Sequence, residues 1–450
     1  MKNLLGRVVV GTALAVMILG QPARAADVTE VEATGVTAWL MSDPAVPVAA
    51  ISFRIEGGAA TDPASLQGRA SLLADLLTEG AGDLDATAFK EKLADLSASI
   101  GFDATQDGIN GTLYTLSENL GAAADLLGMA LTKPRFDEDA LARAKAGQIA
   151  SLRAARERPA RRAYRAFLET AFPNHPYARS VRGRIATLEA VSVADLAAFR
   201  DRRFGRDRLL VTAAGDINSA ALEDAVTRAF GGLPAMASGG PADLAPAALP
   251  QQPLRLFAPV EAPQSTVVFG GPGIRRNDPD WRAATVLMEI MGGGFGARLM
   301  EEVRVKRGLV YGINAGLSEL EAAVLVLGSA STNNATVTET VDVVVAEWGR
   351  MAANGPTQDE LDAAKAYVTG SLPLALDSSR AIADALLAIR LNDLPKDYLD
   401  RRAALIDAVT LDEAKRVARR LFDPKRLMIA VAGAPELGEA WRVVVVKDDD

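Results

Sequence analysis

The sequence predicts an α+β protein made of two similar domains, each a mostly antiparallel sheet packed with helices. The chain has 450 residues, which is too long for one ordinary domain. In each half, strand-like stretches precede long helical patterns and further strands, an order typical of helices layered on an antiparallel sheet. A segment of the first half also recurs in the second half, so we expect a tandem duplication.

The repeat pairs residues 191–215, VSVADLAAFRDRRFGRDRLLVTAAG, with residues 409–433, VTLDEAKRVARRLFDPKRLMIAVAG. Each copy opens with a Ser or Thr that can cap a helix, followed three positions later by an acidic residue. A helix, a short turn containing Asp and an apolar strand then follow in both. Apolar helices running into Gly at 71–82 and 285–296 match at nearly the same offset.

Other helical patterns cover residues 83–100 and 117–133, after the first strand-like stretch. Residues 235–253 are rich in Pro, Gly and Ala and lack periodicity, which is typical of a linker. We therefore predict a first domain over 26–234, a linker over 235–255 and a second domain over 256–450.

The N-terminus has the pattern of a secretory signal peptide, residues 1–25. Basic Lys2 and Arg7 precede an apolar run over 8–20, and an A-x-A-type cleavage site ends at Ala25. The run is shorter than the roughly 20 residues that span a bilayer, and no later segment is suitable. We therefore expect an exported chain without a membrane span, for which the bacterial periplasm is the compartment that fits.

Composition excludes several classes of function. The formal charge is −8 and becomes −11 when the signal peptide, with three basic residues and no acidic ones, is removed. Such an acidic chain does not suggest nucleic acid or anionic lipid as a partner. The absence of cysteine excludes disulfides, thiolate catalysis and Cys-based zinc sites.

Common catalytic motifs are also missing. The one histidine, His175 in FPNHPYARSVRG, cannot form a His-rich zinc site, and its flanking prolines favour a structural or hydrogen-bonding role. No serine-hydrolase elbow, phosphate loop or dinucleotide fingerprint has the right context. The glycine-rich segment 292–296, GGGFG, follows a helix and leads into another, so we predict a tight helix-to-helix turn.

The helix predicted within GRASLLADLLTEGA, residues 68–81, carries Ser71, Ala74 and Asp75 on one face at i, i+3 and i+4. Metallopeptidases place two His ligands and a Glu base at such spacings. The helix therefore has the spacing of such a site but not its two His ligands and Glu base.

The segment RLMEEVRVKRGLVYGINAG, residues 298–316, predicts a helix over 300–306, a stop at Gly308 and a strand from Leu309. Arg304 then lies on the last helical turn and Tyr311 early in the strand. Arg offers a planar fork for a carboxylate, and Tyr offers a hydroxyl to a peptide carbonyl. The pattern alone also fits a solvated Arg and a half-buried Tyr.

These segments, together with HPYARSVRG at 175–183, resemble the M16 peptidases, the group of pitrilysin, insulysin and mitochondrial processing peptidase. More narrowly, the chain is similar to the small two-domain bacterial subunits of that family. The resemblance covers essentially the whole mature chain and is most specific over 291–316. It implies two M16-type (LuxS/MPP-like) α/β domains in tandem.

Active members of the family carry His-x-x-Glu-His in the first-half helix and a third Glu ligand further along. Here those helix positions are Ser71, Ala74 and Asp75, and residues 144–156 contain no carboxylate. One carboxylate is not a zinc site, so the resemblance implies no catalytic residue and no metal in this chain. In the family an Arg and a Tyr at the spacing of Arg304 and Tyr311 grip the substrate peptide.

The resemblance therefore implies a non-catalytic, substrate-binding subunit of a periplasmic heterodimeric zinc metallopeptidase. In the family four such domains enclose a chamber, and this chain supplies two. A zinc-bearing M16 partner would supply the others, while this chain closes the chamber and holds peptide substrates. The alternative is a stand-alone peptide-binding or scaffold protein, as a homodimer, with no proteolytic role.

Overall fold

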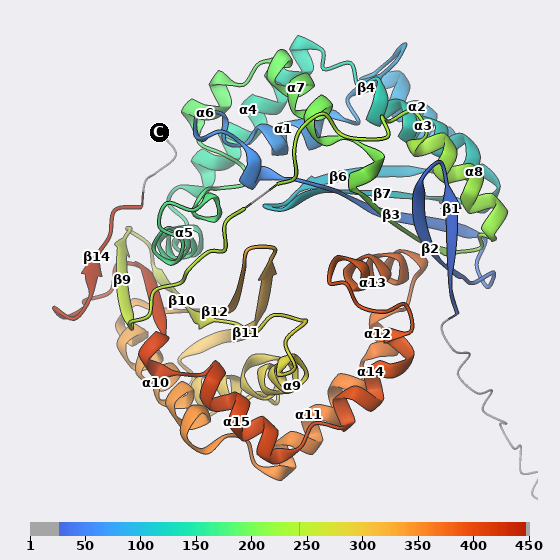
Figure 1. Cartoon of the computed structure of the whole chain (residues 1–450). Coiled ribbons are helices and arrows are strands. Elements are labelled where there is room, and N and C mark those ends of the chain that lie inside the picture. Colours follow the sequence, from blue (N-terminus) through green and yellow to red (C-terminus); the bar gives the residue numbers. More distant parts are fainter. Residues whose placement is uncertain (1–26, 243, 447–450) are drawn as a thin grey trace, which may run out of the picture.

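The computed structural model describes residues 27–242 and 244–446. Two six-stranded sheets face each other, and helices cover the outer side of each (Figure 1). The predicted α+β class with two similar halves is confirmed, whereas the predicted signal peptide lies outside the described residues.

The first sheet has the strand order β1-β2-β8-β3-β7-β6, and only its β2–β8 pair is parallel. Because β8 lies between them, β2 and β3 do not form a hairpin, although they are consecutive in the sequence. The strands are β1 (Val28–Ala33), β2 (Val36–Ser42), β3 (Val48–Glu56), β6 (Ser99–Ala104), β7 (Gly108–Leu116) and β8 (Leu209–Gly215), with a separate short hairpin of β4 (Gly80–Ala81) and β5 (Leu84–Asp85).

The second sheet has the order β14-β9-β13-β10-β12-β11. Its strands are β9 (Leu254–Pro259), β10 (Gln264–Pro272), β11 (Val310–Leu320), β12 (Ala323–Asn333), β13 (Met428–Gly433) and β14 (Arg442–Val443). Across the second sheet, the neighbouring strands β9, β13, β10, β12 and β11 correspond in position to β2, β8, β3, β7 and β6 of the first sheet. In both sets the chain passes through the five positions in the same order. The predicted duplication is therefore present in the topology.

Helices of the first half are α1 (Arg69–Leu76), α2 (Ala86–Asp95), α3 (Leu120–Thr132), α4 (Glu138–Ala155), α5 (Pro159–Ala171), α6 (Ile185–Ala190), α7 (Val193–Arg203) and α8 (Ser219–Phe230). Those of the second half are α9 (Trp281–Gly292), α10 (Val337–Asn354), α11 (Gln358–Gly370), α12 (Leu372–Ala375), α13 (Ser379–Leu391), α14 (Tyr398–Asp407) and α15 (Leu411–Leu421). Two short helical segments used below are η4 (Pro176–Ala178) and the π-helical η6 (Met300–Val305).

The two copies of the repeat form α7 with β8 and α15 with β13. Ser192 and Asp195 form a complete capping box, in which each side chain accepts a hydrogen bond from the other's backbone N–H. Thr410 caps α15 by accepting from the backbone N–H of Glu413. The predicted caps are thus confirmed, and the first copy has the reciprocal bond as well.

The helix predicted over 83–100 is too long at both ends. α2 begins at Ala86 and ends at Asp95, and Ser97 has a left-handed backbone with φ of 47°. Ser99 and Ile100 already belong to β6, which pairs with β7. The helical pattern continued past the true end because Ile100 packs on the same apolar core as the helix.

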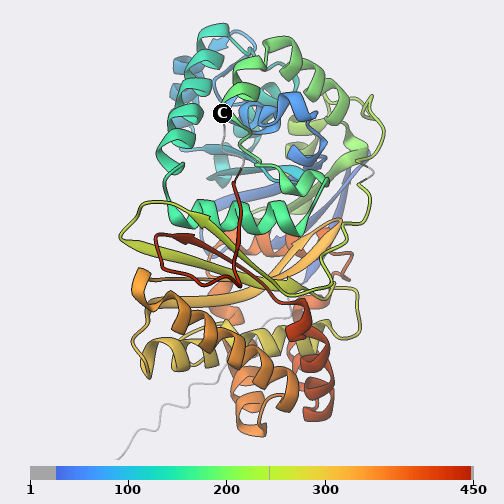
Figure 2. The same ribbon diagram turned by 90° about the vertical axis from the view of Figure 1, so that its left-hand side faces the viewer.

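One helix from each half packs on the sheet of the other half. α5 packs on β10 and β13, and α13 packs on β3 and β8. In the turned view α5 lies between the two halves (Figure 2). Ser52 of β3 donates to Asp384 of α13 at 2.6 Å, and Thr212 of β8 donates to the Ala383 carbonyl at 2.8 Å. The predicted domain limits stay a prediction. These two helices cross between the halves and join them into one structure.

A buried tyrosine adds a polar link between the halves. The hydroxyl of Tyr177, on η4, donates to Asp107 Oδ1 at 2.5 Å and accepts from the backbone N–H of Ala322 at 2.9 Å. Tyr177 is fully buried and Asp107 is 5% exposed. Asp107 also accepts from the backbone N–H of Glu321 at 3.1 Å, so the β6–β7 turn holds the β11–β12 turn.

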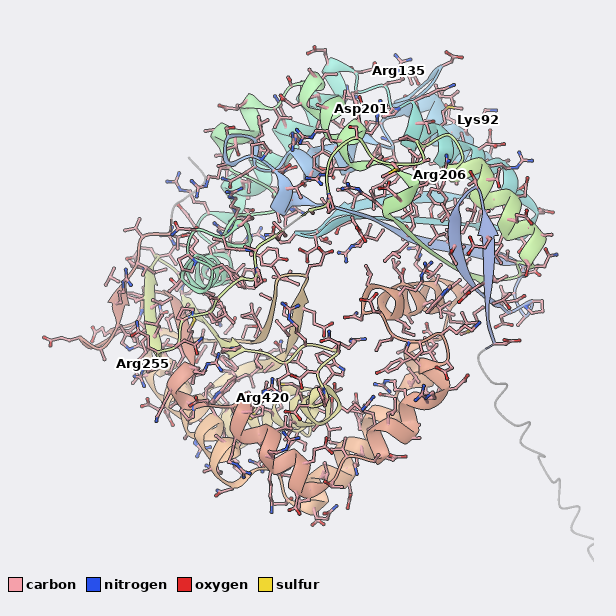
Figure 3. The ribbon with its side chains drawn as sticks, viewed as in Figure 1. Lys92, Arg135, Asp201, Arg206, Arg255 and Arg420 are labelled. Carbon is pink, nitrogen blue, oxygen red and sulfur yellow. The ribbon has the colours of Figure 1, made fainter. Side chains whose placement is uncertain are left out.

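The outer helices of the second half hold the start of α9. Arg420 of α15, labelled in Figure 3, pairs with Asp278 at 2.7 Å and with Asp280 at 2.6 Å. Arg416 also pairs with Asp280, and this hydrogen bond, despite partial burial, lowers the pKa of that carboxyl below its usual value. α9 is therefore anchored at the end opposite to the glycine-rich turn.

Candidate functional site

A buried carboxylate fixes the start of α1. Gly68 precedes the helix with a left-handed φ of 91°. Asp62 accepts a hydrogen bond from the backbone N–H of Ala70 at 3.2 Å and pairs with Arg69 at 3.2 Å. Burial raises the pKa of Asp62 to about 6, because the nearby Arg69 only partly offsets the lost hydration. The helix therefore starts at a defined residue, which sets the direction of its side chains.

The opposite faces of α1 have different surroundings. Leu72, Leu73 and Leu76 are almost fully buried in the core of the first half. The side chains of Ser71, Ala74 and Asp75 instead line one pocket of about 630 Å³, whose other walls come from β6, α4 and residues 181–182. The common face predicted from their spacing is therefore confirmed.

Gln148 of α4 lies across this pocket from α1. It is 5% exposed, and its Nε2 donates to the Arg182 carbonyl at 2.6 Å. Its Oε1 is 3.5 Å from the hydroxyl of Ser71. Gln148 is thus a residue within 144–156 whose side chain reaches Ser71, and its amide has the shape of a glutamate without the charge. Sequence reasoning missed it because only carboxylates were sought there.

Asp75 is the one carboxylate among the three degenerate positions. Burial raises its pKa above the usual value, Arg182 opposes this rise, and Asp103 adds to it. Both Arg182 and Asp103 line the same pocket. The pocket therefore holds charges of both signs and not a concentrated negative field that would hold a divalent cation.

The donor set does not fit catalytic zinc. Such zinc takes three protein ligands, usually His with a carboxylate, and keeps one position for water. At Ser71, Ala74, Asp75 and Gln148 the side chains offer a hydroxyl, a methyl group, a carboxylate and an amide. Within residues 27–242 and 244–446, no group of three His, Cys, Asp or Glu side chains is placed to hold a metal ion.

Two irregular elements bring Arg304 and Tyr311 together. Arg304 lies on the π-helical η6, and Gly308, with a left-handed φ of 64°, ends that segment. Tyr311 lies at the start of β11, where the pairing with β12 shifts by one residue between Val310 and Ile313. π-Helical turns and β-bulges commonly redirect side chains at functional sites.

Arg304 lies between two exposed aromatic rings. Its guanidinium carbon is 5.2 Å from the ring centre of Tyr311 and 5.7 Å from that of Phe295. Tyr311 is 88% exposed and Phe295 is 81% exposed. The half-buried Tyr considered from the pattern is therefore wrong. Phe295 was missed because GGGFG was interpreted only as a turn, which it is, between α9 and the helical segment that leads into η6.

The structure does not bring the two predicted sites together. The pocket of Ser71, Ala74 and Asp75 belongs to the first half, whereas Arg304 and Tyr311 belong to the second. His175 lies in neither place. Its Nδ1 accepts from the backbone N–H of Tyr177 at 3.2 Å, and its Nε2 donates to the Ala245 carbonyl at 3.0 Å, which confirms the predicted hydrogen-bonding role.

Within residues 27–242 and 244–446, no helix has both the length and the apolar character needed to cross a membrane.

Comparisons with known proteins place most of the chain in one family. A family model described as insulinase (peptidase family M16) matches residues 37–184, and one described as peptidase M16 inactive domain matches residues 190–368. The chain is 27% identical over 330 residues to the non-peptidase homolog YmxG of Helicobacter pylori, covering 73% of this chain and 76% of that protein. It is 28% identical over 282 residues to an uncharacterized zinc protease of Streptomyces coelicolor, covering 62% of this chain and 61% of that protein.

The fold gives the same result. A crystal structure of a peptidase M16 inactive domain from Pseudomonas fluorescens superimposes with a TM-score of 0.84 at 26% identity, covering 92% of this chain and 98% of that chain. Matches to both halves, together with a pocket that lacks the metal ligands, leave one conclusion. The chain belongs to peptidase family M16 and is similar to members of it that are described as inactive or non-peptidase.

Proposed function

We propose that this chain is the non-catalytic, substrate-binding subunit of a periplasmic zinc metallopeptidase formed with a second M16 chain. In this proposal the partner holds zinc, which supplies the activated water. This chain completes the chamber and holds the peptide through Arg304 and Tyr311.

One observation carries the proposal. The two halves share one strand order over five strands, yet the helix positions of the first half hold Ser71, Ala74 and Asp75, whereas the second half has a half-buried Arg304 beside an exposed Tyr311. A simple scaffold would have no use for an exposed tyrosine ring in contact with an arginine, beside a π-helical segment and a β-bulge. Exposed aromatic surface of this kind is typical of binding sites.

The sheet edges suit an extended peptide. β6 and β11 each stand at the end of a sheet, paired on one side only among the described strands. Asp103 and Ala104 of β6 also line the pocket beside α1, and Tyr311 belongs to β11. Peptides that add to a sheet edge are held mainly by main-chain hydrogen bonds, so such binding tolerates many sequences.

Export is part of the proposal because the signal-like residues 1–25 precede the first strand. A periplasmic enzyme of two subunits would need both chains to carry such a segment. The sequence of the partner therefore tests this element independently.

The proposal is tested by purifying the tagged chain from its native host and measuring zinc in each co-purifying protein. We expect one M16 partner with His-x-x-Glu-His, about one zinc per partner chain, and peptide hydrolysis only when both chains are present. A homodimer that binds peptides and contains no zinc would instead establish the stand-alone binding or scaffold function.

A further inference from the structure

We propose that Phe295, Arg304 and Tyr311 form a carboxylate-binding clamp, which selects peptides that carry a carboxylate next to an apolar side chain. This inference rests on the proposed function, in which Arg304 and Tyr311 hold the peptide. It adds Phe295 to the site and assigns a chemical class to the ligand.

The positive charge of Arg304 lacks the carboxylate partner that its neighbours have. Among the described residues, no carboxylate oxygen lies within 4 Å of its guanidinium. Three neighbouring cations are paired in this way: Lys306 with Glu302 at 2.6 Å, Arg307 with Glu302 at 2.8 Å, and Arg298 with Glu360 at 2.6 Å.

Glu302 in particular is committed to its two partners. Hydrogen bonds from Lys306 and Arg307 lower its pKa to about 2, so it stays ionised and bound to them. Arg304, on the same π-helical segment, does not share in these ion pairs.

The contact with two aromatic rings does not use the hydrogen-bond donors of Arg304. The guanidinium lies over the rings of Phe295 and Tyr311, an arrangement that uses the flat faces of an arginine. The N–H donors of a guanidinium lie along the edges of the group. An edge with two parallel donors matches a carboxylate bidentately, so a carboxylate is the ligand that completes this arrangement.

The rings also predict what lies beside that carboxylate. Phe295 and Tyr311 expose most of their surface next to the charge. Phe295 is the only side chain between Gly292 and Gly296, and a side chain added at Gly296 would meet nothing within 4 Å. A ligand therefore has room to cover the ring, and an apolar side chain next to its carboxylate would bury this surface.

The test uses the full mature chain and fluorescein-labelled heptapeptides measured by fluorescence anisotropy. One peptide has Leu-Glu-Leu at its centre and an amidated C-terminus, and its partner has Leu-Gln-Leu. A third peptide has the Gln sequence and ends in Leu with a free carboxylate. We expect the Glu or the free-carboxylate peptide to bind about 10-fold or more tightly than the neutral one. Which of the two binds shows whether a side chain or a chain end supplies the carboxylate.

Substitutions then assign the preference to the clamp. Phe295→Ala should weaken binding of the preferred peptide about 5-fold or more, whereas Phe295→Tyr should retain it. Arg304→Lys, which keeps the charge and loses the planar fork, should reduce the preference for the carboxylate. Tyr367→Ala serves as the matched control, because Tyr367 is an aromatic side chain of α11 that is 58% exposed and belongs to no part of the clamp.

The outcomes separate this inference from the proposed function. Equal binding of acidic and neutral peptides, with both lost in Arg304→Ala, overturns the clamp and leaves the substrate-binding role intact. Wild-type binding in Phe295→Ala removes Phe295 from the site. If the correctly folded wild-type chain binds none of the three peptides, the clamp is overturned. The substrate-binding role in the assembled complex is then tested separately, by the kinetics of that complex.

Discussion

Rebuilding the metal site tests whether the fold has kept the geometry of an active M16 half. The triple substitution Ser71→His, Ala74→Glu and Asp75→His restores the helix motif but provides only two zinc ligands. We expect this variant to bind zinc weakly and to lack peptidase activity, because catalytic zinc requires three protein ligands. Adding Gln148→Glu should tighten zinc binding by about 100-fold or more.

The magnitude follows from the position of Gln148. Its Oε1 is 3.5 Å from the Ser71 hydroxyl, and two ligand atoms at about 2.1 Å from a tetrahedral zinc ion lie about 3.4 Å apart. Side chains at 71 and 148 therefore approach as ligands of one ion must. Residues that only support a ligand change metal affinity about 10- to 100-fold, so a direct carboxylate ligand should contribute at least about 2.7 kcal/mol.

The Gln148→Glu substitution has a structural cost in the absence of metal. A carboxylate at this position could not donate to the Arg182 carbonyl, which in the wild-type chain accepts from Gln148 Nε2 at 2.6 Å. An unsatisfied buried acceptor costs about 1–3 kcal/mol, so the metal-free fourfold variant should unfold more easily than the triple variant. Zinc should restore the loss.

The assay is competition with a chromogenic zinc chelator, combined with thermal unfolding with and without zinc. The matched control is Ser151→Glu in the triple background, because Ser151 lies on the same helix and lines the same pocket. The reasoning is refuted if the fourfold variant binds zinc no more tightly than the triple variant, or if Ser151→Glu works equally well.

Three further predictions concern the unmodified site and the contact between the halves. The purified wild-type chain should contain no stoichiometric zinc and cleave no peptide, whereas one equivalent of tightly held zinc with chelator-sensitive proteolysis would overturn the assigned loss of the site. Tyr177→Phe should lower the free energy of unfolding by about 2–4 kcal/mol in urea, since buried Asp107 and the Ala322 N–H each lose a partner; a loss below about 0.5 kcal/mol would contradict the link. Burial raises the pKa of Glu321 from 4.5 to about 7, and the nearby charge of Asp107 adds to this rise. The folded state therefore binds this proton more tightly than the unfolded state. Stability should consequently fall as the pH rises from about 4.5 to 7. Glu321→Gln should flatten that part of the profile of melting temperature against pH, and an unchanged slope would show that Glu321 does not cause it.

The duplication and the local elements were predictable because their signals are local. The repeat at 191–215 and 409–433 carries its caps, turn and strand within one continuous segment, and the structure places each of them. The packing of α5 and α13 on the opposite sheets was not predictable. An amphipathic helix shows that it has a buried face but not which sheet covers it, and that choice depends on contacts far apart in the sequence.

The candidate sites show the same limit. The spacing of Ser71, Ala74 and Asp75 predicted a common face, but the role of Gln148 depends on how α4 crosses α1. Phe295 was visible as the one side chain of a glycine-rich turn, but its exposure and its contact with Arg304 appear only in three dimensions. The sequence pattern of one helix or strand shows which of its faces is apolar. Which residues of two different elements come into contact can be read only from the folded structure.

The most direct test of the central claim is the kinetics of the zinc-bearing complex assembled with Arg304→Ala. Because a charge-assisted hydrogen bond is worth about 1.5–3 kcal/mol, kcat/KM should fall roughly 10- to 150-fold, while zinc content and subunit assembly stay unchanged. Arg307→Ala is the matched control, because Arg307 lies on the same segment but pairs with Glu302; it should leave kcat/KM near the wild-type value. Wild-type kinetics in the assembled Arg304→Ala complex would contradict the assignment of this chain as the substrate-binding subunit.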